Sequence, residues 1–165
     1  MPLARARFHP APARRAAWWR ALLVIALLVG AASTARAGDP LEQQVLSLVN
    51  RHRATRGLPA LRADARIARE ARRHSAAMAS GTVPFGHAGF AERGAALRRV
   101  MPCRSSAENV ASSLGYDDPA GEMVRGWLAS SGHRKNIEGP YETTGVGVAR
   151  SARGQIYVTQ IFVAD

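Results

Sequence analysis

The chain is poor in several residue types, and their scarcity limits what it can be. Its 165 residues include one cysteine, Cys103, so no disulfide can form within the chain and the fold must be held by packing. Aromatic residues make up only 6% of the sequence, and 12 acidic residues stand against 23 lysines and arginines. There is no histidine pair at zincin spacing, no phosphate-binding glycine loop and no nucleophile elbow around a serine, so the common enzyme motifs are missing.

The first 37 residues are predicted to be a secretory signal peptide. They contain six of the basic residues and no acidic residue, and most of the arginines precede an uncharged, largely apolar run at 21–35. Ala35-Arg36-Ala37 places small residues at both positions that a signal peptidase recognises, so cleavage is expected before Gly38. The run of 15 residues is shorter than the roughly 18–20 that a spanning helix needs, which favours export over a membrane anchor. We therefore expect a secreted or periplasmic protein with no transmembrane anchor after cleavage.

The formal charge of +11 includes the basic residues of this leader, so the net charge of the remaining residues is considered separately. Residues 38–165 carry 17 basic and 12 acidic groups, a net charge of +5. Within them, a spacing of four, three and four residues would place four arginines on one face of a helix: Arg62, Arg66, Arg69 and Arg73. Such a row favours a solvated helix surface over a polyanion site, so no specific nucleic-acid partner is expected.

The spacing of apolar residues predicts one domain, residues 38–165, with helices first and most strands last. Capping residues and helical periodicity predict three helices, at 39–56, 64–81 and 118–130. Alternation predicts strands at 107–111, 145–150 and 155–163, the last two joined as a hairpin. Helices combined with a small antiparallel sheet indicate an α+β layered domain.

Residues able to bind a metal or move a proton are few, and three strings place them among small or apolar neighbours. The strings are FGHAGF at 85–90, AENVA at 107–111 and WLASSGHRKNI at 127–137. His52 and His74 lie on predicted helices without partners at useful spacing, so both are interpreted as ordinary surface or boundary residues.

The three strings in this order resemble the bacterial branch of the CAP superfamily, the SCP-like extracellular domains. Further segments carry the resemblance: VN at 49–50, RGLP at 56–59, GVGV at 145–148 and YVTQ at 157–160. The resemblance covers residues 40–163 and implies a secreted, single-domain, three-layer α-β-α sandwich with a surface cleft of histidines and acids. By motif position, it places His87, Glu108 and His133 in that cleft.

The sequence departs from the family pattern at two places. A glutamate that eukaryotic members carry shortly after the helix tryptophan corresponds here to Ser130, and a glutamate of many bacterial relatives corresponds to Thr143, with Glu142 beside it. Glu142 is therefore only a candidate fourth cleft residue. Further candidates for lining the cleft or binding a ligand are Asn109, Arg134 and Asn136, of which the two asparagines are expected to fix loops and Arg134 to be a cleft cation or a loop brace.

Two imidazoles and a carboxylate from separate segments suit Zn2+ or another divalent cation. The same three groups could instead transfer protons without a metal, or bond one another and hold the loops together. Two functions remain open. One is a noncatalytic secreted module that binds a lipid, a cell-wall component or a protein partner. The other is a metal-assisted hydrolase acting on peptide or cell-wall bonds, which is the less favoured because no dedicated base or oxyanion donor can be identified.

Overall fold

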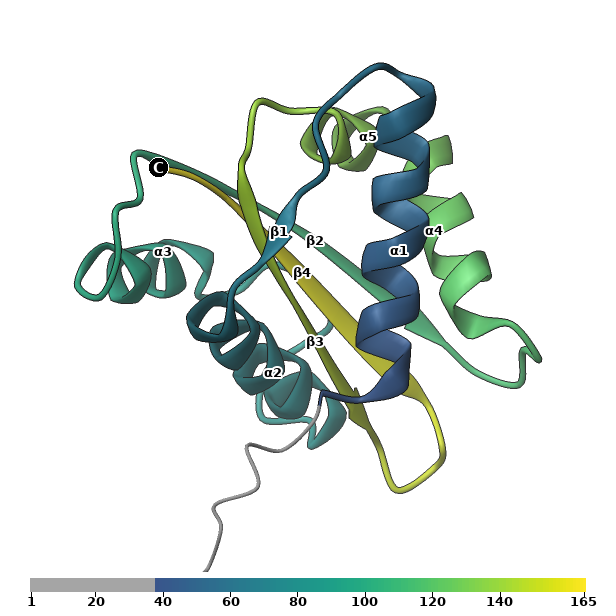
Figure 1. Cartoon of the computed structure of the whole chain (residues 1–165). Coiled ribbons are helices and arrows are strands. Elements are labelled where there is room, and N and C mark those ends of the chain that lie inside the picture. Colours follow the sequence, from purple (N-terminus) through teal and green to yellow (C-terminus); the bar gives the residue numbers. More distant parts are fainter. Residues whose placement is uncertain (1–37) are drawn as a thin grey trace, which may run out of the picture. The chain divides into compact units, whose positions relative to one another are not determined.

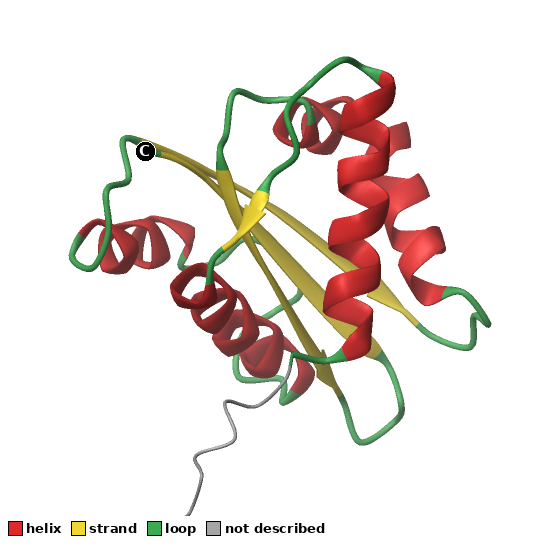
Figure 2. Cartoon of the chain, in the orientation of Figure 1, coloured by secondary structure: helices red, strands yellow, loops and turns green. Residues whose placement is uncertain are grey.

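Four strands form one sheet that lies between two layers of helices (Figures 1 and 2). The computed structural model describes residues 38–165, and the predicted signal peptide, residues 1–37, lies outside the described residues. In chain order the elements are α1 (Pro40–Thr55), β1 (Arg62–Ala63), α2 (Ala65–Ala79), α3 (Phe90–Arg98), β2 (Ser105–Ser113), α4 (Pro119–Ala129), α5 (Ser131–Ile137), β3 (Thr143–Arg150) and β4 (Ile156–Ala164). The predicted three-layer α-β-α sandwich is confirmed.

The sheet has the strand order β1-β3-β4-β2. The predicted hairpin is β3 and β4, which pair antiparallel from Thr143↔Val163 to Arg150↔Ile156. β2 pairs antiparallel with β4 along its whole length and is longer than the predicted strand. The predicted small antiparallel sheet is extended by one parallel pair, because the two-residue β1 pairs parallel with β3. A strand this short has no periodicity of its own and depends on the neighbour that it pairs with.

The predicted helix starts are confirmed by their capping bonds. The Asp39 carboxylate accepts the backbone N–H of Leu41 at 2.9 Å, and Pro40 follows at the first helical position. Asp64 and Asp118 cap α2 and α4 in the same way. Two other helices, α3 and α5, were not predicted. Both helices are short. Because only Ser130 separates α4 from α5, the sequence pattern of α5 resembles the end of α4.

The two helical layers pack on the sheet through different cores. α1, α4 and α5 cover one face with a large apolar cluster that includes Trp127 and Phe162. α2 and α3 cover the other face with a smaller cluster. Its members are Ile67, Ala71, Leu97, Met101, Ile161 and Val163.

Two glycines of β3 let α2 approach the sheet at backbone distance. A Cβ at Gly145 would overlap the backbone of Ala68, and one at Gly147 would overlap the backbone nitrogen of Arg72. Next to them, the Ser75 hydroxyl donates to the Gly147 carbonyl at 2.9 Å. The GVGV segment therefore lets α2 pack closely on β3, and this close packing positions the loop that follows α2.

Among residues 38–165, none of the helices has both the length and the apolar character required to span a membrane.

Candidate functional site

The first two predicted cleft residues are in contact. His87 lies in the loop between α2 and α3, and Glu108 lies on β2. Their side chains meet with His87 Nδ1 3.0 Å from Glu108 Oε1. The histidine side chain is 49% exposed and the glutamate side chain only 1%. The pair therefore joins a buried carboxylate to an imidazole at the surface.

Arg93, on α3, completes this contact and was not predicted from the sequence. Its Nε donates to Glu108 Oε2 and its Nη2 to Glu108 Oε1, both at 2.8 Å, while Nη1 donates to the Ala88 carbonyl at 2.8 Å. Two parallel bonds of this kind are the strongest form of arginine–carboxylate pairing. One signal in the sequence pointed to such a partner, since a glutamate inside a buried strand requires a compensating cation.

His133, on α5, brings the second imidazole to the site from the opposite helical layer. The ring centroids of His87 and His133 are 6.1 Å apart. Burial, and then the nearby His87, lower the pKa of His133 below its ordinary value of 6.5. The ring of His133 is therefore neutral at neutral pH, with a lone pair on one nitrogen.

The two asparagines hold the backbone beneath the histidines, as expected of residues that fix loops. Asn109 Nδ2 donates to the His133 carbonyl at 3.1 Å. Asn136 Nδ2 donates to the Glu108 carbonyl at 3.2 Å and to Asn109 Oδ1 at 2.9 Å. They tie α5 to the edge strand β2 and so place His133 beside His87 and Glu108.

The interpretation of His74 as an ordinary surface or boundary histidine is wrong. Its residue exposure is 4%, and its Nε2 donates to the Gly86 carbonyl at 2.7 Å. Burial is the main cause that lowers the pKa of His74 below 6.5. Gly86 has a φ of 145° and directly precedes His87, so His74 anchors the loop that carries the cleft histidine.

The remaining candidates lie at different distances from this centre. Ser130 is the residue between α4 and α5, and its carbonyl accepts the N–H of Arg134 at 2.9 Å. Arg134 Nη1 donates to the Leu128 carbonyl at 2.8 Å, so its side chain braces this turn. Glu142 is not brought to the cleft. It precedes β3 and accepts the N–H of Asp165, at the β1 side of the sheet, whereas Glu108 lies on the opposite edge strand.

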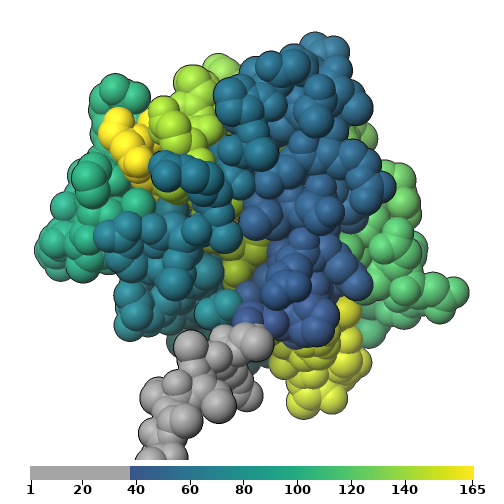
Figure 3. All heavy atoms as spheres, in the orientation of Figure 1, coloured from purple at the N-terminus to yellow at the C-terminus, as the bar shows by residue number. Residues whose placement is uncertain are grey.

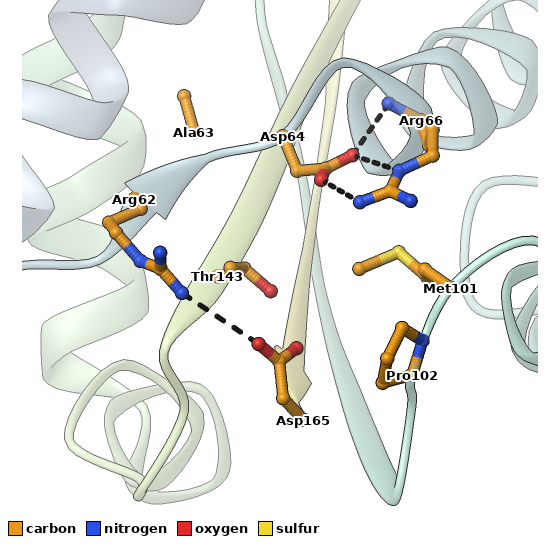
Figure 4. A pocket seen from close by; sticks show the side chains of 8 residues that line it. All are labelled: Arg62, Ala63, Asp64, Arg66, Met101, Pro102, Thr143 and Asp165. Carbon is orange, nitrogen blue, oxygen red and sulfur yellow. Dashed lines mark hydrogen bonds and ion pairs between the residues drawn. The ribbon is translucent and has the colours of Figure 1, made fainter.

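A cavity of about 340 Å³ lies beside β1 and the start of β3, and none of the predicted cleft histidines lines it (Figure 4). It is lined by Arg62, Ala63, Asp64, Arg66, Met101, Pro102, Thr143 and Asp165. Its charged side chains already pair with one another: Arg66 lies 2.6 Å from Asp64, and Arg62 lies 3.7 Å from Asp165. The cavity is thus balanced in charge by its own lining.

The geometry of the cleft fits a two-histidine site better than a three-ligand site. Nδ1 of His87 faces the Glu108 carboxylate and donates to it, so Nε2 is the ring nitrogen left for an ion. Glu108 is already bonded by Arg93 and His87. Within residues 38–165, no set of three or more histidine, cysteine, aspartate or glutamate side chains is arranged to hold a metal ion.

Comparison with protein families gives one match. The model of the cysteine-rich secretory protein family, CAP, matches residues 46–162, more than half of the chain. No curated protein matches the sequence.

Solved structures of three similar proteins share the fold. An extracellular protein with an SCP domain from Bacillus anthracis is 29% identical with a TM-score of 0.61, and the match covers 76% of this chain and 40% of that protein. An outer surface protein from Borrelia burgdorferi is 15% identical with a TM-score of 0.62, covering 75% and 92%. NaASP2, crystallised with Zn2+, is 12% identical with a TM-score of 0.52, covering 78% and 82%. The chain thus spans well under half the length of the Bacillus anthracis protein.

Proposed function

Because the chain belongs to the cysteine-rich secretory protein family, CAP, we propose that it is an exported, noncatalytic binding module of the cell envelope. Its cleft binds a divalent cation such as zinc through His87 and His133, and a lipid, cell-wall or protein ligand is recognised there. The described similarities to an extracellular protein and to an outer surface protein support the location. The crystallisation of NaASP2 with Zn2+ supports the choice of ion.

The observation that carries this proposal is the placement of the two imidazoles. The bond to Glu108 occupies Nδ1 of His87, so Nε2 is the nitrogen available to an ion, and the lowered pKa of His133 keeps that ring neutral at neutral pH. Neutral imidazole nitrogens are the ligands that zinc prefers to oxygen donors, and they bind magnesium and calcium poorly. Zn–N bonds of about 2.0–2.1 Å allow one ion to reach two rings whose centroids are 6.1 Å apart. A bound zinc ion would supply an electrophilic centre with coordination positions open to a ligand.

Glu108 is assigned the orienting role in this site. A carboxylate that accepts the second N–H of a metal-binding histidine fixes the tautomer and the ring orientation. Arg93 in turn fixes the carboxylate.

The same contacts argue against the hydrolase alternative. A glutamate that activates water needs a carboxylate oxygen free to take a proton from it. The Glu108 side chain is 1% exposed, and both of its oxygens accept hydrogen bonds from Arg93 or His87. The Glu108 carboxylate is therefore shielded from water and already bonded at both oxygens, which makes it a poor base for activating a water molecule.

The test is isothermal titration with zinc at about pH 7.5 and about pH 5.5, on either side of the ordinary histidine pKa of about 6.5. Binding is expected at the higher pH and is lost at the lower pH, because protons compete for both imidazoles. His87→Ala and His133→Ala each abolish it. His52→Ala is the matched control, because His52 bonds Glu138, the residue that follows α5, and has no contact with the cleft side chains.

Binding that persists in either cleft variant would place the ion elsewhere and refute the proposed site. Glu108→Gln tests whether the Glu108 carboxylate orients His87 for the ion. It should weaken zinc binding by about 10- to 100-fold as an orienting residue, and an unchanged affinity would show that the carboxylate does not act on the ion.

A further inference from the structure

The positive charge of the described residues is concentrated on one of the two helical layers. The segment 65–104, which holds α2, α3 and the loops after them, contains eight arginines and two acidic residues. The other residues of 38–165 contain nine basic and ten acidic groups. The sheet thus separates a basic side from a nearly neutral one, and the teal residues of this segment form one side of the molecule in Figure 3.

Several arginines of this segment are exposed and form no ion pair with any other described residue. Arg66 and Arg73 pair with Asp64 and Glu70. The exposed arginines without such a partner are Arg69, Arg98, Arg99 and Arg104. Three of these four lie within seven residues, at the end of α3 and in the loop that leads to β2.

The same short segment, residues 98–104, also presents apolar side chains to solvent. Val100 is 55% exposed, and Pro102 is exposed as well. Between them Met101 is buried in the core under α2, which anchors the loop. Arg66 Nη1 also donates to the Val100 carbonyl at 3.1 Å. The segment is therefore held in place while its valine points outward among arginines that have no partner.

We propose that the 98–104 segment docks the protein on an anionic lipid membrane. One arginine guanidinium can donate two hydrogen bonds to the oxygens of a phosphate group. Basic residues that lie within about one Debye length of an anionic bilayer are attracted to it. Val100 and Pro102 enter the interface between headgroups and acyl chains, where small apolar side chains are more stable than in water. Lipid headgroups and soluble polyanions both offer phosphate groups to the arginines. The exposed side chains of Val100 and Pro102 favour the lipid surface as the partner.

This surface lies at the opposite end of α3 from the cleft. Arg93 contacts Glu108 from the first turn of α3, and Arg98 ends the helix. A helix of nine residues is about 13 Å long at 1.5 Å per residue. Docking through the 98–104 segment would hold the histidine cleft close to the membrane without covering it.

The experiment measures binding of the protein to vesicles of equal parts phosphatidylglycerol and phosphatidylcholine, with pure phosphatidylcholine vesicles as reference. The probe variant is Arg98→Gln/Arg99→Gln/Arg104→Gln. It should bind the anionic vesicles about fivefold more weakly for each arginine removed, or roughly 100-fold in all. Added salt should weaken the wild type in the same direction.

The matched control is Arg51→Gln/Lys135→Gln/Arg153→Gln. These residues are exposed, lie outside the 65–104 segment and form no ion pair with another described residue. Both variants lose three charges, and any contribution of residues 1–37 is the same in both. Equal losses in the two variants would overturn the proposal, because binding would then follow total charge. Equal thermal midpoints verify that both variants are folded.

A second variant distinguishes a membrane from a soluble polyanion. Val100→Ser should weaken binding to the anionic vesicles severalfold and leave binding to inorganic polyphosphate unchanged. A wild type that binds polyphosphate and not the vesicles, or a Val100→Ser variant with full vesicle affinity, would refute the membrane as the partner.

Discussion

The two helical layers hold the same sheet by different physical means. α1, α4 and α5 cover their face with apolar volume, centred on the buried Trp127. α2 and α3 use fewer apolar side chains. They rely on backbone contact at Gly145 and Gly147 and on buried polar bonds made by His74, Arg93 and Ser75. An apolar core tolerates swaps that conserve volume, whereas a backbone contact with no room for a Cβ does not tolerate an added side chain. The layer that carries the loop of His87 thus has the smaller apolar core and the closer backbone contact with the sheet.

Among the substitutions that test this difference, Arg93→Met is expected to have the largest effect on stability. It leaves the buried Glu108 carboxylate without its cation, and breaking a buried pair in this way should cost about 3–5 kcal/mol of unfolding free energy. Arg125→Met is the control in the other layer, because the pair of Arg125 with Glu122 is exposed and should be worth about 0–1 kcal/mol.

Urea unfolding measures both losses. The double variant Arg93→Met/Glu108→Gln should recover much of the stability, since it removes the unpaired charge as well. Similar losses for Arg93→Met and Arg125→Met would show that burial does not distinguish the two ion pairs.

A smaller effect is expected from Gly147→Ala. The added methyl group would overlap the backbone of Arg72, so α2 has to move away from β3 at a cost of about 1–3 kcal/mol. In α4, Gly126→Ala meets no atom within 4 Å and should raise stability by roughly 0.5–1 kcal/mol, because alanine is the better helix former. Opposite signs in thermal unfolding would confirm the comparison, and equal signs would contradict it.

The smallest effect concerns the pH dependence of stability. Because burial lowers the pKa of His74, the folded protein resists a proton that the unfolded chain accepts at the ordinary value of 6.5. Stability contributed by this histidine is therefore present above about pH 6.5 and is lost as the pH falls toward the lowered folded value.

His74→Gln tests this contribution while retaining a side-chain donor for the Gly86 carbonyl. The unfolding free energy of the variant should fall less steeply below about pH 6.5 than that of the wild type. His133, whose pKa is also lowered, keeps part of the slope. Parallel pH profiles for variant and wild type would contradict the role given to His74.

Local signals in the sequence predicted most of the framework. Asp39, Asp64 and Asp118 mark helix starts because a capping carboxylate acts on N–H groups only two or three residues away. The hairpin of β3 and β4 was predicted because alternation and a short turn are also local. β1 was missed because its two residues become a strand only by pairing with β3, some 80 residues later in the chain.

The candidate site was predictable only in part for the same reason. The placing of His87, Glu108 and His133 came from the order of three motifs, which does not show that Arg93 occupies the carboxylate. In the sequence His74 looks like an ordinary helical residue, and Arg93 lies in a segment for which no helix was predicted. Their burial follows from how α2 and α3 sit on the sheet, which no short window of residues contains. The misplacement of Glu142 arose similarly, because the strand order decides that it lies at the far side from β2.

The strand β2 stands at an edge of the sheet, and its backbone carbonyls at Glu108 and Val110 accept side-chain bonds from Asn136 and Trp127. An open edge strand is a template on which the strand of another molecule can add, the first step of aggregation. Side chains from α4 and α5 fill these acceptors and hold two helices against the edge. These two helices thereby leave fewer acceptors of the edge strand open to a strand of another molecule.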